Sequence, residues 1–202
     1  MTAEIINIAC ADRGRAFSRC REVIRSGGVI VYPTDTFYGI GVDPTNPAAV
    51  KRLFEIKGRK ADQPILLLIK NAAEVAEWAT DITPNADRLM KQYWPGPLTL
   101  VFKAKPDVLP ELTARTGTIG LRVPGTELAR ELLRFLDIAL TGTSANVSGG
   151  PSPRTAGESM ASIGHIVDLI LDGGTTMGGL PSTVVDVRSD QPKVIRKGAV
   201  TL

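Results

Sequence analysis

Histidine and cysteine are scarce in this chain of 202 residues. The sequence holds one histidine, His165, and two cysteines, Cys10 and Cys20. A structural zinc site usually takes four Cys or His ligands, so these residues cannot build one, and no metal site of the protein's own is expected. A histidine-based catalytic triad would have to use His165 itself, which disfavours that class of mechanism.

Long apolar runs and the common nucleotide-binding motifs are also missing. No run of 18 apolar residues occurs, and the first residues lack the apolar stretch of a secretion signal. We therefore expect a cytoplasmic protein that does not enter a membrane. The sequence contains no G-x-x-x-x-G-K-S/T, no G-x-G-x-x-G that opens a helix, and no G-x-S-x-G. A bound nucleotide would have to be held by another kind of loop.

The overall composition is that of an ordinary globular protein. Hydrophobic residues make up 43% and charged residues 22% of the chain, which excludes wholesale disorder. The formal charge is only +3, so a polyanionic partner such as RNA stays open without being indicated. Twenty glycines and 14 prolines are scattered without a period and predict many sharp turns. The length suits one domain over residues 1–202.

The hydrophobic pattern alternates between strand-like and helix-like stretches. Strands are predicted at residues 5–8, 29–32, 65–69, 98–102, 119–123, 139–141, 166–171, 184–187 and 194–195. Helices are predicted at residues 13–25, 47–57, 85–93, 126–135 and 155–162. This alternation favours an α/β fold. Because the late strands follow one another closely, we expect a mixed sheet with flanking helices.

Polar and glycine-rich segments fall at the ends of the predicted strands. They include residues 33–36, 143–150, 172–174 and 181–183. Ligand sites of open α/β sheets gather outside strand ends, so these segments could converge on one cleft. The segments at 33–36 and 143–150 are equally explained as turns stabilised by side-chain to backbone hydrogen bonds.

Two groups of cations stand out. Lys57, Arg59 and Lys60 surround Gly58 at a predicted helix end, where they either hold phosphates or merely favour the helix dipole beside a Gly58 cap. Arg122 lies within an apolar strand, where a guanidinium needs an anionic partner. A small carboxylate substrate, Asp43 or Asp186 could each supply that partner.

In their order and together, seven segments resemble the YrdC-like family. They are residues 33–39, 57–59, 94–99, 121–124, 144–149, 182–186 and 196–198, so the motif-bearing region is about 28–198. The resemblance implies a single-domain twisted open α/β sheet with a concave, often basic face. It also implies a nucleotidyltransferase that makes threonylcarbamoyl-AMP and pyrophosphate from L-threonine, bicarbonate or CO2, and ATP. Mg²⁺ would be held mainly by the ATP phosphates.

The resemblance also assigns site residues. Lys57 and Arg59 would be catalytic and hold the ATP phosphates. The other residues expected at ATP are Gln63, Thr118, Ser144, Asn146, Ser152 and Arg196. Those expected at L-threonine are Thr36, Leu68, Arg122, Gly142 and Ser182, with Arg122 pairing with the threonine carboxylate. Leu68 departs from the family, in which histidine is common at this position, and Gln63 stands where asparagine is often found.

The same resemblance implies partners. The product would pass to TsaD-, TsaB- and TsaE-type proteins that modify tRNA, and the chain would be a short form without the extra C-terminal domain of longer relatives. Two alternatives remain open at this point. One is an RNA-binding YrdC-like module that uses the concave face, and the other is a paralogue that acts on another amino acid or carbamoyl substrate.

Overall fold

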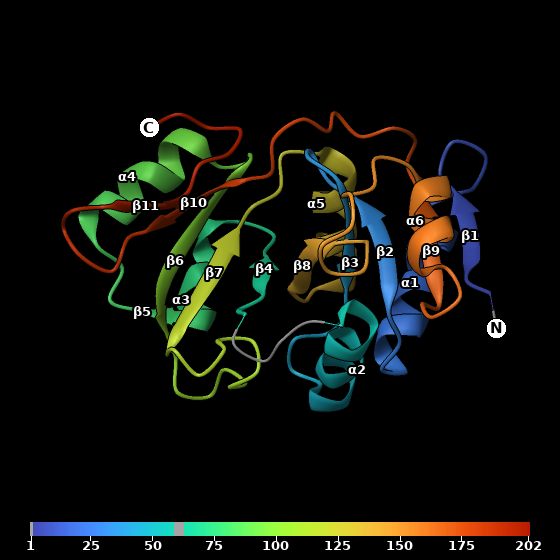
Figure 1. The fold of residues 1–202 in the computed structure, drawn as a ribbon, viewed down its shortest axis with the longest axis horizontal. Coiled ribbons are helices and arrows are strands. Elements are labelled where there is room, and N and C mark those ends of the chain that lie inside the picture. The colour runs from blue at the N-terminus through green and yellow to red at the C-terminus, as the bar shows by residue number, and fades with distance from the viewer. Residues whose placement is uncertain (1, 59–62) are drawn as a thin grey trace.

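The computed structural model describes residues 2–58 and 63–202, and it forms one twisted mixed sheet with helices packed on it (Figure 1). The strands are β1 (Glu4–Asn7), β2 (Ile30–Pro33), β3 (Tyr38–Gly41), β4 (Leu66–Leu68), β5 (Ala79–Thr80), β6 (Leu98–Ala104), β7 (Thr118–Arg122), β8 (Leu140–Ser144), β9 (Leu169–Asp172), β10 (Thr183–Asp186) and β11 (Lys193–Arg196). The helices are α1 (Arg13–Arg25), α2 (Pro47–Lys57), α3 (Val75–Trp78), α4 (Pro84–Tyr93), α5 (Glu127–Leu136) and α6 (Ala156–Ile163), with a 3₁₀ turn η1 (Ala72–Glu74).

The strand order is β1-β9-β2-β3-β8-β4-β7-β6-β10-β11, and β5 pairs with β6. The pairs β1/β9, β9/β2, β4/β7 and β6/β10 are parallel, and the remaining neighbours are antiparallel. The prediction of a mixed α/β sheet is therefore confirmed. Strand β8 joins the two halves, because Ser144 faces Gly39 of β3 in the register while Gly142 faces Leu66 of β4.

Alternating residues of the central strands feed two separate cores. In β2, Ile30 and Tyr32 join the core beneath α1 and α5, whereas Val31 joins the core on the other face, to which α2 and α6 contribute. This follows from the two-residue period of a strand. Each fully buried side chain of this size contributes roughly 1.5–3 kcal/mol to the free energy of unfolding.

Local sequence signals set both ends of α2, and its C-terminal end matters for the site because Lys57 lies there. Asn46 accepts hydrogen bonds from the backbone amides of Ala48 and Ala49, and Pro47 occupies the first turn. Gly58 ends the helix with φ of 55°, a left-handed conformation that glycine adopts without strain. The prediction of Gly58 as the cap is confirmed, and it fixes the direction in which Lys57 leaves the last turn.

The hydrophobic pattern missed β3, the short β5, and the α3–η1 segment. The pattern predicts no strand at β3, where Gly39 and Gly41 have low strand propensity. Both glycines face Tyr32, and a Cβ at Gly41 would lie 2.6 Å from Tyr32 Cε1. The tertiary packing of the Tyr32 ring therefore explains a strand that local propensity does not favour.

The two ends of the sheet are linked by a long excursion after β9. Residues 173–182 run along the top of Figure 1 from β9, near one end of the sheet, to β10, near the other. Tyr38 Oη donates to Gly174 O at 2.6 Å, and the Gly178 amide donates to Thr36 O at 2.8 Å. These bonds tie the segment to the β2–β3 turn, and burial raises the pKa of Tyr38 to about 12. The segment ends at Ser182, directly before β10.

Candidate ligand-binding site

A cavity of about 840 Å³ opens where the two halves of the sheet meet. Thr36 enters it from the β2–β3 turn, Ser144 from the end of β8 and Arg122 from the end of β7. Ser182 comes from the start of β10, and Arg196 from the end of β11. Five chain segments that are far apart in the sequence thus supply polar groups to one cavity, as the pattern of polar strand ends predicted.

Most of the predicted site residues line this cavity. They are Thr36, Gln63, Leu68, Thr118, Arg122, Gly142, Ser144, Ser152, Ser182 and Arg196. Arg59 lies outside the described residues. Lys57 and Asn146 are not among the lining residues and are buried instead, with exposed fractions of 2% and 4%. The structure gathers these residues in one place, and their roles toward a ligand stay predictions.

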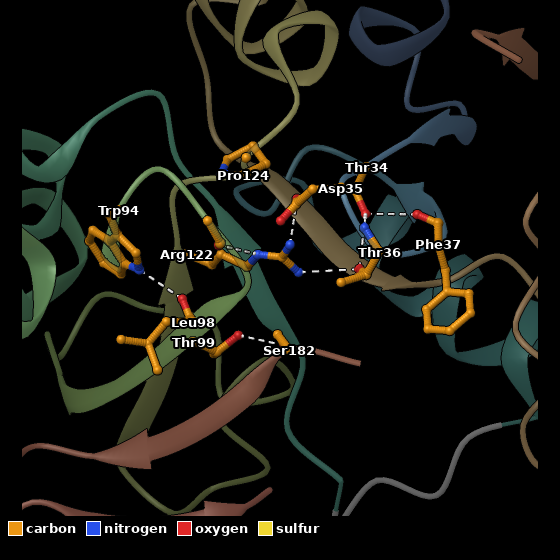
Figure 2. A network of polar contacts seen from close by, with 12 residues as sticks. Thr34, Asp35, Thr36, Phe37, Trp94, Leu98, Thr99, Arg122, Pro124 and Ser182 are labelled. Atoms are coloured by element: carbon orange, nitrogen blue, oxygen red, sulfur yellow. Dashed lines mark hydrogen bonds and ion pairs between the residues drawn. The ribbon is translucent and has the colours of Figure 1, made fainter. Parts of the chain in front are cut away.

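Arg122 is held on three sides (Figure 2). Its Nε donates to Gly96 O at 2.9 Å, Nη1 lies 3.5 Å from Thr36 Oγ1, and Nη2 forms an ion pair with Asp35. The prediction that Asp43 or Asp186 could be the anionic partner of Arg122 is wrong. Asp43 accepts hydrogen bonds from Thr45, and Asp186 pairs with Arg188. Asp35 is closer because the β2–β3 turn folds over the end of β7.

Ser182 connects the guanidinium group of Arg196 to Thr99 of β6. Its Oγ lies 2.9 Å from Thr99 Oγ1, and Arg196 Nη2 donates to Ser182 O at 2.8 Å and lies 3.1 Å from Ser182 Oγ (Figure 2 shows the Thr99–Ser182 pair). Partial burial, and then the charge of Arg122, lower the pKa of Arg196 below its usual range. Two guanidinium groups thus lie close enough to influence each other, an arrangement that favours an anion between them.

Lys57 organises the loop that follows β8. Its Nζ donates to Ser144 O and Asn146 O, each at 2.6 Å, and lies 3.2 Å from Asn146 Oδ1. The Ser148 amide donates in return to Lys57 O at 2.9 Å. The role of Lys57 at the ATP phosphates stays a prediction, and the ammonium lies behind Ser144 and binds backbone and amide oxygens. The cause is α2, whose last turn aims Lys57 at the loop.

The chemistry of the cavity wall is cationic, hydroxyl-rich and partly apolar. Among the described lining residues there is no carboxylate, and Arg122 and Arg196 supply the charge. Leu66 and Leu68 form an apolar portion beside Gly142, where a Cβ would lie 2.6 Å from Leu66 Cδ1. Glycine at this position keeps the cavity open next to the leucines. Such a wall suits an anionic ligand that also carries a small apolar group.

Sequence reasoning missed two residues that shape the site, Asp35 and Thr99. Both lie in segments that carry the family resemblance, residues 33–39 and 94–99, but neither was assigned a role at the site. The sequence feature that pointed to an acidic residue here is Arg122, because a guanidinium in an apolar strand requires a carboxylate nearby. Choosing among the acidic residues required the tertiary contact.

The described residues form neither a metal-binding cluster nor a membrane-spanning helix. Within residues 2–58 and 63–202, no group of three or more His, Cys, Asp or Glu side chains is placed to hold a metal ion. In the same part of the chain, no helix is long and apolar enough to span a bilayer.

Fold and site together define an α/β ligand-binding protein, with a cation-lined cavity at the strand ends of a mixed sheet. The family model Sua5/YciO/YrdC, described as telomere recombination, matches residues 22–198, and the chain belongs to this family. The resemblance to the YrdC-like family is thereby confirmed.

Named relatives and solved structures agree with this assignment. The threonylcarbamoyl-AMP synthase of Pyrococcus abyssi is 38% identical over 180 residues, which are 89% of this chain and 53% of that protein. This chain therefore spans about half the length of that relative. The crystal structure of P. abyssi Sua5 complexed with L-threonine matches with a TM-score of 0.91 and 33% identity, over 98% of this chain and 58% of the other. E. coli YciO matches with a TM-score of 0.86 and 31% identity, over 98% and 96%.

Proposed function

We propose that this protein synthesises threonylcarbamoyl-AMP from L-threonine, bicarbonate or CO2, and ATP, with release of pyrophosphate. The observation that carries the proposal is the cavity that brings Arg122, Arg196 and Ser182 together with an apolar wall at Leu68. The name of the P. abyssi relative and the threonine bound to its Sua5 support the same chemistry. They favour a synthase over an RNA-binding module or a paralogue with another substrate.

The proposed reaction needs no nucleophilic side chain of the protein, so a wall of hydroxyl and guanidinium groups suits it. The threonine amine adds to CO2 and loses a proton, which gives a carbamate. A carbamate oxygen then forms a bond to the α-phosphorus of ATP, and the bond between that phosphorus and the β-phosphate bridging oxygen breaks. Negative charge gathers on the phosphoryl oxygens and the departing pyrophosphate, so positioning and cationic groups supply the catalysis.

The residues divide between the two substrates. Thr36, Arg122 and Ser182 are proposed to hold threonine, with Arg122 at its carboxylate. Leu68 and Gly142 would face its side chain and backbone. On the nucleotide side we propose Gln63, Thr118, Ser144, Ser152 and Arg196, with Arg59 at the phosphates. Arg122 already has Asp35 as a counter-ion, so threonine would bind a guanidinium that is oriented before the substrate arrives.

The proposal extends to Mg²⁺, partners and location. Hydroxyl and guanidinium groups, rather than carboxylates, dominate the described wall, so Mg²⁺ fits this site as part of the ATP complex, held by the phosphates. When bound it would neutralise phosphate charge. The product would pass to TsaD-, TsaB- and TsaE-type proteins for tRNA modification in the cytoplasm, and the concave face could meet tRNA.

Pyrophosphate release tests the proposed function. The purified protein is supplied with MgATP, bicarbonate and L-threonine, and each of the three is left out in turn. We expect release only in the complete mixture, together with a product of the mass of threonylcarbamoyl-AMP. Release that ignores threonine would contradict the proposal. Equal release with L-serine would indicate the paralogue instead, and tight tRNA binding without any release would indicate the RNA-binding module.

A further inference from the structure

Lys57 is the most deeply buried charged residue in the described part of the chain, at 2% exposure. A buried ammonium costs several kcal/mol unless it is fully hydrogen-bonded. Lys57 meets this requirement through three oxygens of the loop formed by residues 144–150: Ser144 O, Asn146 O and Asn146 Oδ1. An ammonium has three N–H donors, so the loop alone matches its full donor capacity.

The position of Lys57 also determines how Asn146 is oriented. Because an ammonium only donates, the side-chain atom of Asn146 that faces it must be the oxygen. The Asn146 Nδ2 group then donates to Val147 O at 2.9 Å and to Gly150 O at 2.6 Å. Asn146 therefore closes the loop on itself, with both ends of its amide in use.

The orientation of the Asn146 amide in turn fixes the direction of the Ser144 hydroxyl. The Ser144 hydroxyl donates to Asn146 Oδ1 at 2.5 Å, so its proton is directed into the loop. A hydroxyl has one proton and two lone pairs, which leaves Ser144 as an acceptor toward the cavity that it lines. The ammonium of Lys57, which lies behind the cavity wall, thus determines that the Ser144 hydroxyl in the wall acts as a hydrogen-bond acceptor.

We infer that Lys57 is a positioning residue: it fixes the 144–150 loop and the acceptor character of Ser144, and it does not itself bind the nucleotide phosphates. Asn146 belongs to the same unit. The part that concerns ATP rests on the proposed function, whereas the part that concerns the loop does not.

Two measurements on the protein without substrate test the loop part. In Lys57→Met, hydrogen exchange of peptides covering residues 144–150 should become at least about tenfold faster, because the loop loses its central donor. Lys51→Met is the matched control, since Lys51 lies on the same helix, is 79% exposed, and pairs only loosely with Glu55 at 3.9 Å. Its exchange should equal that of the wild type. Unchanged exchange in Lys57→Met would overturn the inference.

Limited acetylation of the wild-type protein tests the same point without any variant. Lys57 should stay unmodified both with and without ATP, while Lys51 is acetylated in both. A lysine that binds phosphate would instead be acetylated in the free protein and protected by ATP, and that result would overturn the inference. This arm remains decisive if Lys57→Met fails to fold.

Steady-state kinetics test the part that concerns ATP. Lys57→Met should raise KM for ATP about tenfold and leave KM for threonine within twofold, a split that a general loss of structure would not produce. Asn146→Ala should show the same split, and the double variant should be clearly less impaired than the product of the two factors. If the two increases in KM multiply in the double variant, the shared role of Lys57 and Asn146 is overturned.

A wild-type protein that turns over no substrate would refute the proposed function. Hydrogen exchange and acetylation would still decide the role of Lys57 in that case.

Discussion

Arg122 and Asp35 form an ion pair that is almost entirely removed from solvent, with side-chain exposures of 5% and 11%. Within the described chain, no hydrogen bond reaches either Asp35 oxygen, so Arg122 is its charge partner. Breaking a buried pair by removing one charge is strongly destabilising because the other charge stays buried. The pair therefore links the stability of the fold to the geometry of the cavity.

Asp35→Asn should lower the free energy of unfolding by about 3 kcal/mol, since Arg122 would lose its counter-ion. In a protein of this size, the melting temperature should fall by roughly 10 °C. Asp43→Asn is the control, because an asparagine there can still accept the hydrogen bonds from Thr45. Thermal unfolding checks both variants, and equal melting temperatures would contradict a structural role for the pair.

Replacing both members of the pair should separate stability from binding. The double variant Asp35→Leu with Arg122→Met leaves no unpaired charge at this position and should unfold close to the wild type. It should bind threonine at least about tenfold more weakly, since losing a charge-assisted hydrogen bond costs about 1.5–3 kcal/mol. Calorimetric titration with threonine measures this. Wild-type affinity would show that Arg122 does not meet the substrate carboxylate.

Arg196→Gln should weaken ATP binding about tenfold, the effect of losing about 1.4 kcal/mol. Its guanidinium lies against Ser182 in the cavity wall, whereas Lys193 of the same strand does not line the cavity. Lys193→Gln is therefore the matched control and should bind ATP as the wild type does. Fluorescence titration with a labelled ATP analogue compares the two, and similar losses would indicate only a general charge effect.

Two glycines should respond in opposite ways to alanine. Gly41→Ala should cost about 1–3 kcal/mol, because the new Cβ would lie 2.6 Å from Tyr32 Cε1 and 3.3 Å from Thr141 O. Gly157→Ala should stabilise the protein by up to about 1 kcal/mol, since Gly157 lies in α6 with nothing closer to its Cβ than Thr155 Oγ1 at 3.9 Å. Urea unfolding at neutral pH measures both changes.

Alkaline pH should destabilise the fold through Cys20. Burial raises the pKa of the Cys20 thiol to about 12. In the unfolded chain this thiol loses its proton near pH 8.5, so above that pH the folded state binds more protons and the free energy of unfolding falls as pH rises. Cys20→Ala should show a shallower fall between about pH 9 and 11 in urea unfolding. An identical slope would assign the effect to other groups.

The local sequence determined most of the secondary structure. Residues 13–25 and 47–57 are helices with the predicted ends, because amphipathic spacing, Asn46, Pro47 and Gly58 act within a few residues of one another. The mixed α/β class followed from the alternation of such segments. The grouping of polar strand ends also pointed to one cavity, since strand ends that share an edge of a sheet lie close together.

Tertiary structure alone decided which groups meet. The pairing of Arg122 with Asp35 rather than Asp43 or Asp186 depends on how the β2–β3 turn folds over β7. The resemblance assigns Lys57 to the ATP phosphates, but only the tertiary structure shows that the last turn of α2 buries its ammonium behind Ser144. Sequence spacing carries short-range preferences, whereas the partner of a buried charge is chosen by contacts between segments that are 87 residues apart, as in the case of Lys57 and Ser144.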